Sequence, residues 1–170
     1  VQFSEPINAA QHSTTASIDW PFWIAAVWLG GILAIVFVWL TRYALFQRHL
    51  PRIDEPKEAH RQEWSNVCRL AGLRDSIPLW GLAGWGPACG WMKRRIVVFV
   101  PTERWSQFTA DQRWAILLHE AAHLKRGDLW KSLAVRLLAL PQWFNALPWR
   151  LVRRFDEAAE WACDEFILRH

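Results

Sequence analysis

One stretch of the chain constrains its fold more than any other, because residues 20–40, WPFWIAAVWLGGILAIVFVWL, contain no charged side chain. About 20 such residues in a helix span roughly 30 Å, the thickness of the hydrocarbon core of a bilayer. Trp20 and Trp39 stand near its two ends, where membrane proteins place aromatic side chains. The stretch therefore predicts a transmembrane helix over residues 20–41.

Two other interpretations of this apolar stretch fit the sequence less well. A buried helix of a soluble protein would carry a polar stripe, and this stretch has none. A cleaved signal peptide carries basic residues before its apolar run, whereas residues 1–19 contain two acids and no Lys or Arg. Residues 1–19 also lack helical or strand periodicity, so we expect them to form an extracytoplasmic arm or loop.

The distribution of basic residues predicts the orientation of the span. Arg42, Arg48 and Arg52 follow it, and no Lys or Arg precedes it. The positive-inside rule then places residue 42 onward in the cytoplasm, with the N-terminus outside. The three cysteines are widely spaced and form no CxxC pair. This pattern is typical of a reducing compartment rather than of a disulfide framework.

After the span, the sequence predicts a linker and one further domain. Residues 42–60 include the charged, proline-bearing stretch PRIDEPKEAH, and helical spacing resumes after it. A chain of 170 residues has room for one modest domain beyond the span, and we expect it to occupy residues 61–170. Because the chain starts with valine and stops within a helical pattern, we expect it to be cut from a longer protein.

This domain is predicted to be mostly helical with a small antiparallel sheet, which is an α+β fold. The β-branched run at residues 96–100 predicts a strand, and a second strand is expected around residues 78–82. Residues 137–149, LLALPQWFNALPW, are apolar but contain two prolines and are too short to span a bilayer. We expect them to form a hairpin buried in the core rather than one apposed to the membrane.

The clearest helix of the domain is bounded by sequence signals at both ends. Thr109, with Gln112 three residues later, forms a capping box, and Gly127 is a typical helix end. These signals predict a helix over about residues 110–126. Asp128 is then placed to cap a following helix.

The predicted helix carries the sequence HEAAH, in which His119 and His123 stand one turn apart on the same face. A catalytic zinc ion takes three protein ligands and a water molecule, and this pair supplies two ligands. Glu120 lies about 100° round the helix, where it could take a proton from that water. The spacing fits equally two core histidines and a salt-bridged Glu120, so the interpretation requires a third ligand.

The third ligand is expected from the acidic stretch DEAAEWACDEF. Glu160 and Asp164 share one face through their i,i+4 spacing. One of them could bind the metal while the other accepts the outer N–H of a histidine ligand. Other acids of this stretch fit a solvated surface paired with arginines. Spacing alone does not choose among the candidates, which are Asp156, Glu157, Glu160, Asp164 and Glu165.

Together these motifs resemble the BlaR/MecR-type membrane metallopeptidases, the signal transducers known from β-lactam resistance in bacteria. LLHEAAHLKRGD, WFNALPW and EWACD match the motifs of that family in order and spacing, over roughly residues 60–170. Arg95 and Ala146 depart from the pattern, because the family often has proline there. Neither position is a proposed ligand.

The resemblance implies a zincin-like domain of the gluzincin type with Zn²⁺ as its cofactor. It implies Glu120 as the general base and Asp164 as a supporting residue. An extended peptide substrate would add to the strand at residues 96–100, taken as the edge over the cleft. The ligands that it implies are His119, His123 and Glu160.

We therefore expect a zinc endopeptidase of a bacterial sensor-transducer, anchored in the lipid bilayer of the inner membrane with its peptidase domain in the cytoplasm. Its substrate would be a cytoplasmic protein such as a repressor, or the receptor itself by self-cleavage. The alternative is a non-proteolytic signalling or scaffold protein with a structural zinc site, against which the intact Glu120 weighs. Nucleic-acid binding is not expected despite the net charge of +4, because the chain lacks a contiguous basic face and a recognition motif.

Overall fold

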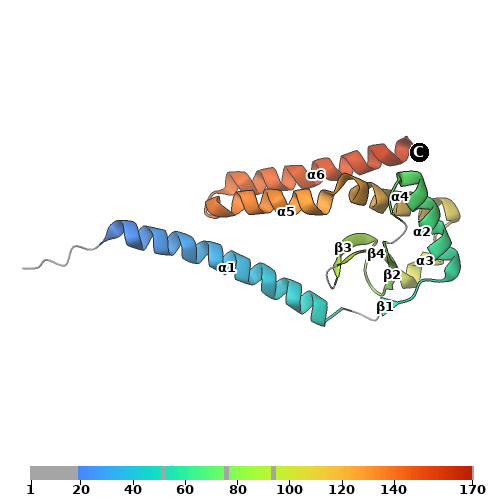
Figure 1. The fold of residues 1–170 in the computed structure, drawn as a ribbon, viewed down its shortest axis with the longest axis horizontal. Coiled ribbons are helices and arrows are strands. Elements are labelled where there is room, and N and C mark those ends of the chain that lie inside the picture. Colours follow the sequence, from blue (N-terminus) through green and yellow to red (C-terminus); the bar gives the residue numbers. More distant parts are fainter. Residues whose placement is uncertain (1–18, 51–52, 75–76, 93–94, 170) are drawn as a thin grey trace, which may run out of the picture.

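A computed structural model describes residues 19–50, 53–74, 77–92 and 95–169 and shows a long N-terminal helix leading to an α+β body (Figure 1). The expected arm at residues 1–19 lies almost wholly outside the described residues. Along the chain, the elements are α1 (Trp20–Arg48), β1 (Ile53–Asp54), α2 (Glu58–Ala71), β2 (Leu79–Leu82), β3 (Ala88–Met92), β4 (Arg95–Pro101), α3 (Thr102–Trp105), α4 (Ala110–Arg126), α5 (Asp128–Ala139), a 3-10 turn (Leu140–Gln142) and α6 (Ala146–Leu168).

Helix α1 extends away from the sheet, and none of its residues is buried. A proline in its first turn, Pro21, suits a helix start, because that position has no intrahelical N–H partner. The helix continues to Arg48, past residue 41 where the span was predicted to end. Within the described residues, it is the one helix whose length and composition would let it cross a membrane.

The sheet has four strands in the order β1, β2, β4, β3. β1 and β3 pair antiparallel with their neighbours, whereas β2 and β4 run parallel, with Leu79 opposite Val98. The α+β class is confirmed, but the prediction of an antiparallel sheet is wrong. The reason is β3, which the sequence did not predict. Along the chain it comes between β2 and β4 and runs opposite to β4, so β2 and β4 point the same way.

Strand β4 lies in the interior of the sheet, between β2 and β3. The expectation that residues 96–100 form the edge over the cleft is therefore wrong, and β3 occupies that edge. β4 is covered on both faces, because Val98 and Val100 pack against helices while Val97 and Phe99 pack in a second cluster on the opposite face. Burial on both faces explains its uninterrupted apolar sequence.

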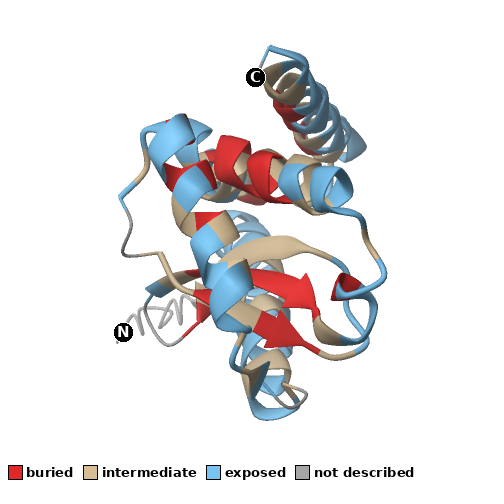
Figure 2. Ribbon diagram, turned by 90° about the vertical axis from the view of Figure 1, so that its right-hand side faces the viewer, coloured by how far each residue is buried: buried red, intermediate tan, exposed pale blue. Residues whose placement is uncertain are grey.

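The main core lies between the sheet and helices α2 and α4. Trp64, Val67 and Cys68 of α2 meet Leu117 and Leu118 of α4 over the strands. Figure 2 shows this as buried residues gathered on the strands and on the helix that crosses them. The core therefore fixes α4 directly on the sheet, with its HEAAH sequence close to strand β3.

Helix α4 has the predicted bounds and the predicted cap. The Thr109 hydroxyl accepts a hydrogen bond from the Gln112 N–H, and the Gln112 side chain accepts one from the Thr109 N–H, at 3.2 and 3.0 Å. Gly127 ends the helix with a positive φ of 69°. The prediction that Asp128 caps the next helix is wrong, because Gly127 is the N-cap of α5 and the Asp128 side chain is buried.

Helices α5 and α6 form an antiparallel hairpin whose tip lies away from the sheet and beside α1 (Figure 1). The Asn145 side chain starts α6 by accepting a hydrogen bond from the Leu147 N–H at 3.0 Å. The prediction that residues 137–149 are buried in the core is wrong, since Leu138 is 80% and Phe144 68% exposed. The described elements leave the outer side of this tip uncovered.

Candidate active site

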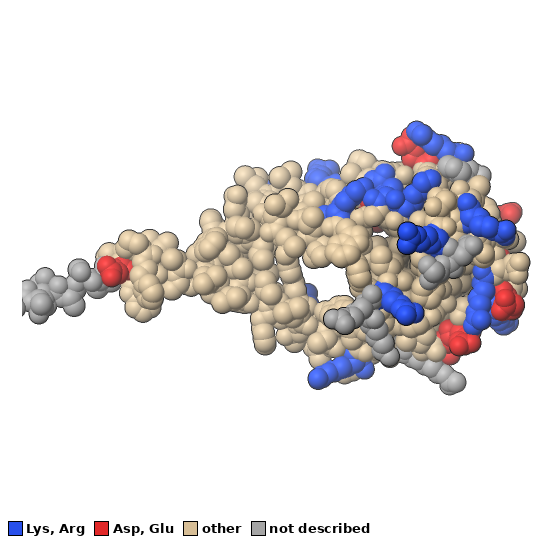
Figure 3. Space-filling model, viewed as in Figure 1, with Lys and Arg blue, Asp and Glu red and all other residues tan. Residues whose placement is uncertain are grey.

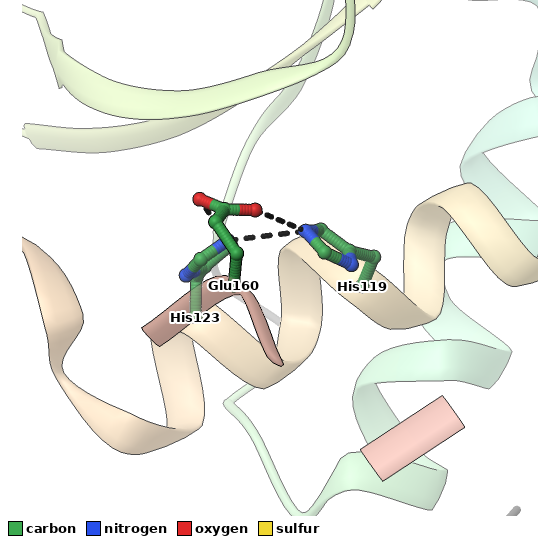
Figure 4. A group of neighbouring side chains, drawn as sticks. All are labelled: His119, His123 and Glu160. Carbon is green, nitrogen blue, oxygen red and sulfur yellow. Dashed lines mark hydrogen bonds and ion pairs between the residues drawn. The ribbon is translucent and has the colours of Figure 1, made fainter. Parts of the chain in front are cut away.

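Helices α4 and α6 bring three potential metal ligands together. Figure 4 shows His119 and His123, one turn apart on α4, pointing toward the Glu160 carboxylate on α6. The two Nε2 atoms lie 3.2 Å apart. Glu160 Oε2 lies 3.2 Å from His119 Nε2, and Glu160 Oε1 lies 3.6 Å from His123 Nε2.

A carboxylate contacts the outer nitrogen of each histidine. His119 Nδ1 lies 3.2 Å from Asp164 Oδ1, and His123 Nδ1 lies 3.1 Å from Asp128 Oδ2. Since a carboxylate only accepts hydrogen bonds, each Nδ1 can donate its N–H to the carboxylate beside it. This arrangement favours the tautomer in which Nε2 offers its lone pair to a metal.

The two Nε2 atoms and the Glu160 carboxylate thus face one another as potential metal ligands. A zinc ion with ligands at 2.0–2.1 Å in tetrahedral geometry would separate them by about 3.3–3.4 Å. In this site the two Nε2 atoms are 3.2 Å apart, and the Glu160 carboxylate reaches His119 Nε2 at 3.2 Å through Oε2 and His123 Nε2 at 3.6 Å through Oε1. Both the donor set and its dimensions thus fit zinc, with His119, His123 and Glu160 as the residues that would hold it.

Glu120 lies on the same helix but outside this group of three, and it is only 6% exposed. Burial raises the pKa of its carboxyl to about 7, while the neighbouring His119 charge and a hydrogen bond with Cys89 act in the opposite direction. It lines a cleft of about 540 Å³ together with both histidines and Glu160. A buried carboxyl with a pKa near neutrality suits proton transfer in this cleft.

Asp128 is a site residue that sequence reasoning assigned to a different task. Its Oδ2 accepts hydrogen bonds from His123 Nδ1 and from Arg126 Nε, the latter at 3.2 Å. The αL turn at Gly127 reverses the chain and returns Asp128 toward His123. The available signal was an acid directly after a helix-ending glycine, within reach of the last turn of α4.

The cysteine of the EWACD sequence lies behind the histidines. Cys163 Sγ is buried 3.3 Å from His123 Nδ1 and 3.7 Å from Asp128 Oδ2. Burial and then the Asp128 charge raise the pKa of this thiol to about 12. The thiol donates to Asp128, and Cys163 fills the space behind the histidines.

The other acids of α6 do not reach the site histidines. Glu157 pairs with Arg154 at 3.3 Å and Glu165 with Arg169, both at the surface. Asp156 lines the cleft, but its carboxylate is bound to Arg136 at 2.7 Å. The structure thus brings Glu160 and Asp164 to the histidines and leaves these three acids paired with arginines.

Strand β3 borders the cleft as the edge of the sheet. Ala88 and Cys89 of this strand line the cleft, together with the preceding Pro87. One side of β3 pairs with β4, and the other side carries no strand among the described residues. The main chain of β3 is therefore placed to bind an extended peptide beside the histidines.

Comparison with known proteins bears on the same region. The family model described as BlaR1 peptidase M56 matches residues 2–170. A segment of 64 residues is 38% identical to the regulatory protein BlaR1 of Bacillus licheniformis. That segment covers 38% of the chain and 11% of the BlaR1 protein, so the match spans a small part of that relative.

Proposed function

Because the chain belongs to the BlaR1 peptidase M56 family, we propose that it is a membrane-anchored zinc endopeptidase of a sensor-transducer. The observation that carries this proposal is the convergence of two Nε2 lone pairs and one carboxylate within 3.2 to 3.6 Å. The outer carboxylates Asp128 and Asp164 support it, since they set the histidine tautomers that metal binding requires.

In this proposal each residue of the cleft has a separate task. Zinc, when bound, supplies a Lewis acid and an acidified water molecule. Glu120 takes the proton of the attacking water on a carboxylate oxygen and transfers it to the nitrogen of the leaving amine. Asp164 and Asp128 keep His119 and His123 oriented throughout, so they are positioning residues.

We propose that the substrate is an extended segment of protein that adds as a strand to β3. This replaces the pairing with residues 96–100 that the sequence suggested. Main-chain hydrogen bonds to β3 would hold the peptide alongside this strand, so that it lies across the cleft that Glu120 lines. Recognition through the main chain tolerates many side chains, so a second feature of the substrate must supply specificity.

The proposed setting is the inner membrane of a bacterium, with the peptidase on the cytoplasmic side. The basic residues after the apolar run favour this orientation. The relative in Bacillus licheniformis is called a regulatory protein, which supports a substrate that controls gene expression or the receptor itself. A non-proteolytic protein with a structural zinc remains the competing proposal.

Zinc stoichiometry and peptide cleavage, measured on the detergent-solubilised chain, test this function. We expect one zinc per chain, loss of cleavage with retained zinc in Glu120→Gln, and weakened zinc binding in Glu160→Gln. The matched control is Glu157→Gln, which removes the same charge one turn earlier on α6 and should change neither measurement. Zinc bound equally by the parent and by Glu160→Gln would refute the ligand set. Zinc binding without any cleavage by the parent chain, self-cleavage included, would favour the structural role.

A further inference from the structure

The α5–α6 hairpin tip has an apolar outer side that none of the described elements covers. Residues 137–149 contain no charged side chain, and Arg136 and Arg150 bound them on the two arms. The exposed side chains at and around the tip include Leu137, Leu138, Phe144, Leu147 and Leu151. A surface of this kind on a water-soluble domain would favour aggregation or association.

This tip lies against the apolar part of α1. The Trp28 indole N–H donates to the Pro141 carbonyl at 2.7 Å, and the Trp143 indole N–H donates to the Trp28 carbonyl at 3.2 Å. Gly31 allows the close approach, because a Cβ at that position would overlap the Trp143 ring. The hairpin is therefore packed on the segment predicted to cross the membrane.

Several polar groups of the tip are paired within the protein. Its two indole N–H groups, from Trp143 and Trp149, both donate to main-chain carbonyls. The Asn145 amide donates to the Gln142 side chain at 3.1 Å, and its oxygen accepts from the Leu147 N–H. Hydrocarbon demands this internal pairing, because each unpaired polar group there costs several kcal/mol.

Charge marks the same boundary on α1 and on the hairpin. Trp39 and Trp149 are in edge-to-face contact with ring centroids 6.3 Å apart, and an arginine follows each of them closely in sequence, Arg42 on α1 and Arg150 on α6. Figure 3 shows charged side chains over the sheet-bearing end and an uncharged surface over the hairpin tip and most of α1. Aromatic side chains followed by arginines are typical of a cytoplasmic membrane interface.

We propose that the tip of the α5–α6 hairpin, residues 137–149, is inserted in the lipid bilayer beside α1 as a re-entrant element. It enters and leaves on the side of the peptidase domain. Trp28 precedes Leu40 by 12 residues of helix, so the tip reaches about 18 Å into a hydrocarbon core of about 30 Å. Acyl chains occupy the apolar groove between Phe144 and the N-terminal half of α1.

Cysteine labelling of the full chain in phosphatidylcholine–phosphatidylglycerol vesicles tests the insertion. Leu138→Cys and Phe144→Cys introduce thiols at the tip, and Leu168→Cys is the matched control at the far end of α6. Leu138 and Leu168 are similarly exposed in the protein itself, at 80% and 87%, so lipid accounts for a difference between them. The parent chain, with its three cysteines buried or partly buried, gives the background.

A water-soluble maleimide, present on both sides of the membrane, should label the tip thiols at least about tenfold more slowly than Leu168→Cys, because an apolar surrounding suppresses the thiolate. Dissolving the vesicles in denaturing detergent should remove the difference. Nitroxide labels at the two tip positions should collide readily with oxygen and poorly with a nickel chelate.

Two results would overturn the proposal. The tip thiols would react as fast as Leu168→Cys if water covers the hairpin, and their nitroxides would be shielded from both oxygen and nickel if a second protein copy covers it. Two tip positions keep the test decisive when one variant fails to fold. The measurements require neither zinc nor cleavage, so their outcome is independent of the proposed peptidase function.

Discussion

Replacement of Asp128 by asparagine separates the charge of this carboxylate from its shape. Asp128 Oδ2 accepts a hydrogen bond from His123 Nδ1 at 3.1 Å, and the two side chains are only 7% and 13% exposed. Asparagine offers an oxygen of nearly the same position without the negative charge. The histidine tautomer can therefore persist, while the imidazole becomes a weaker donor of its Nε2 lone pair to zinc.

The expected magnitude follows from this contact. A hydrogen bond to a charged group contributes about 1.5–3 kcal/mol and a neutral one about 0.5–1.5 kcal/mol, so the lost difference is about 1–1.5 kcal/mol. Low exposure at both groups means that water screens little of it. Since 1.4 kcal/mol is tenfold in affinity, we expect zinc binding about 10-fold weaker, within the 10- to 100-fold typical of such partners.

A competition titration against a chromophoric chelator measures this affinity at fixed pH. The control is Asp156→Asn, which removes an acid lining the same cleft whose partner is Arg136 rather than a histidine, and it should leave the affinity unchanged. Circular dichroism of both metal-free variants checks that the helices are retained. Equal zinc affinity of Asp128→Asn and the parent chain would refute the role assigned to Asp128.

Three further outcomes are expected. In unfolding measurements in detergent, Gly31→Ala should destabilise the protein by about 1–3 kcal/mol, because the new methyl group displaces Trp143. Gly30→Ala is the control and should be neutral or stabilising, because its new methyl group meets open space. Glu63→Gln should lower the free energy of unfolding in urea by about 1–3 kcal/mol, because it weakens a half-buried, bidentate pair with Arg113 that joins α2 to α4; an unchanged midpoint would contradict this. Zinc at 100 times its dissociation constant should stabilise the folded chain by about 2.7 kcal/mol, and a chelator should reverse the rise in melting temperature.

The parts of the fold that sequence predicted correctly are those with local signals. The bounds of α4 follow from Thr109, Gln112 and Gly127, all of which act on their own helix. The parallel pairing of β2 with β4 was missed because it depends on β3, whose glycine-containing sequence ACGWM lacks a clear strand pattern.

The candidate site divides in the same way. His119, Glu120 and His123 are specified by spacing within one helix, whereas Glu160 was one of five acids until the family resemblance selected it. Asp128 was missed because its task depends on the direction in which the chain leaves Gly127. The hairpin tip was assigned to the core because an apolar sequence does not by itself show whether the protein buries it.

The third potential ligand lies on a different helix from the first two, so a metal bound to all three would connect α4 to α6. By thermodynamic reciprocity, a displacement of α6 that weakens zinc affinity by some factor is itself made less favourable by the same factor when zinc is bound. Glu160 lies 14 residues, about 21 Å, along α6 from Ala146 beside the hairpin tip. A tilt of a few degrees about that tip would move the carboxylate by about 1 Å, against zinc–oxygen distances of about 2.0–2.2 Å. A small tilt of α6 at the hairpin tip would therefore change the position of the potential ligand Glu160 enough to alter metal binding.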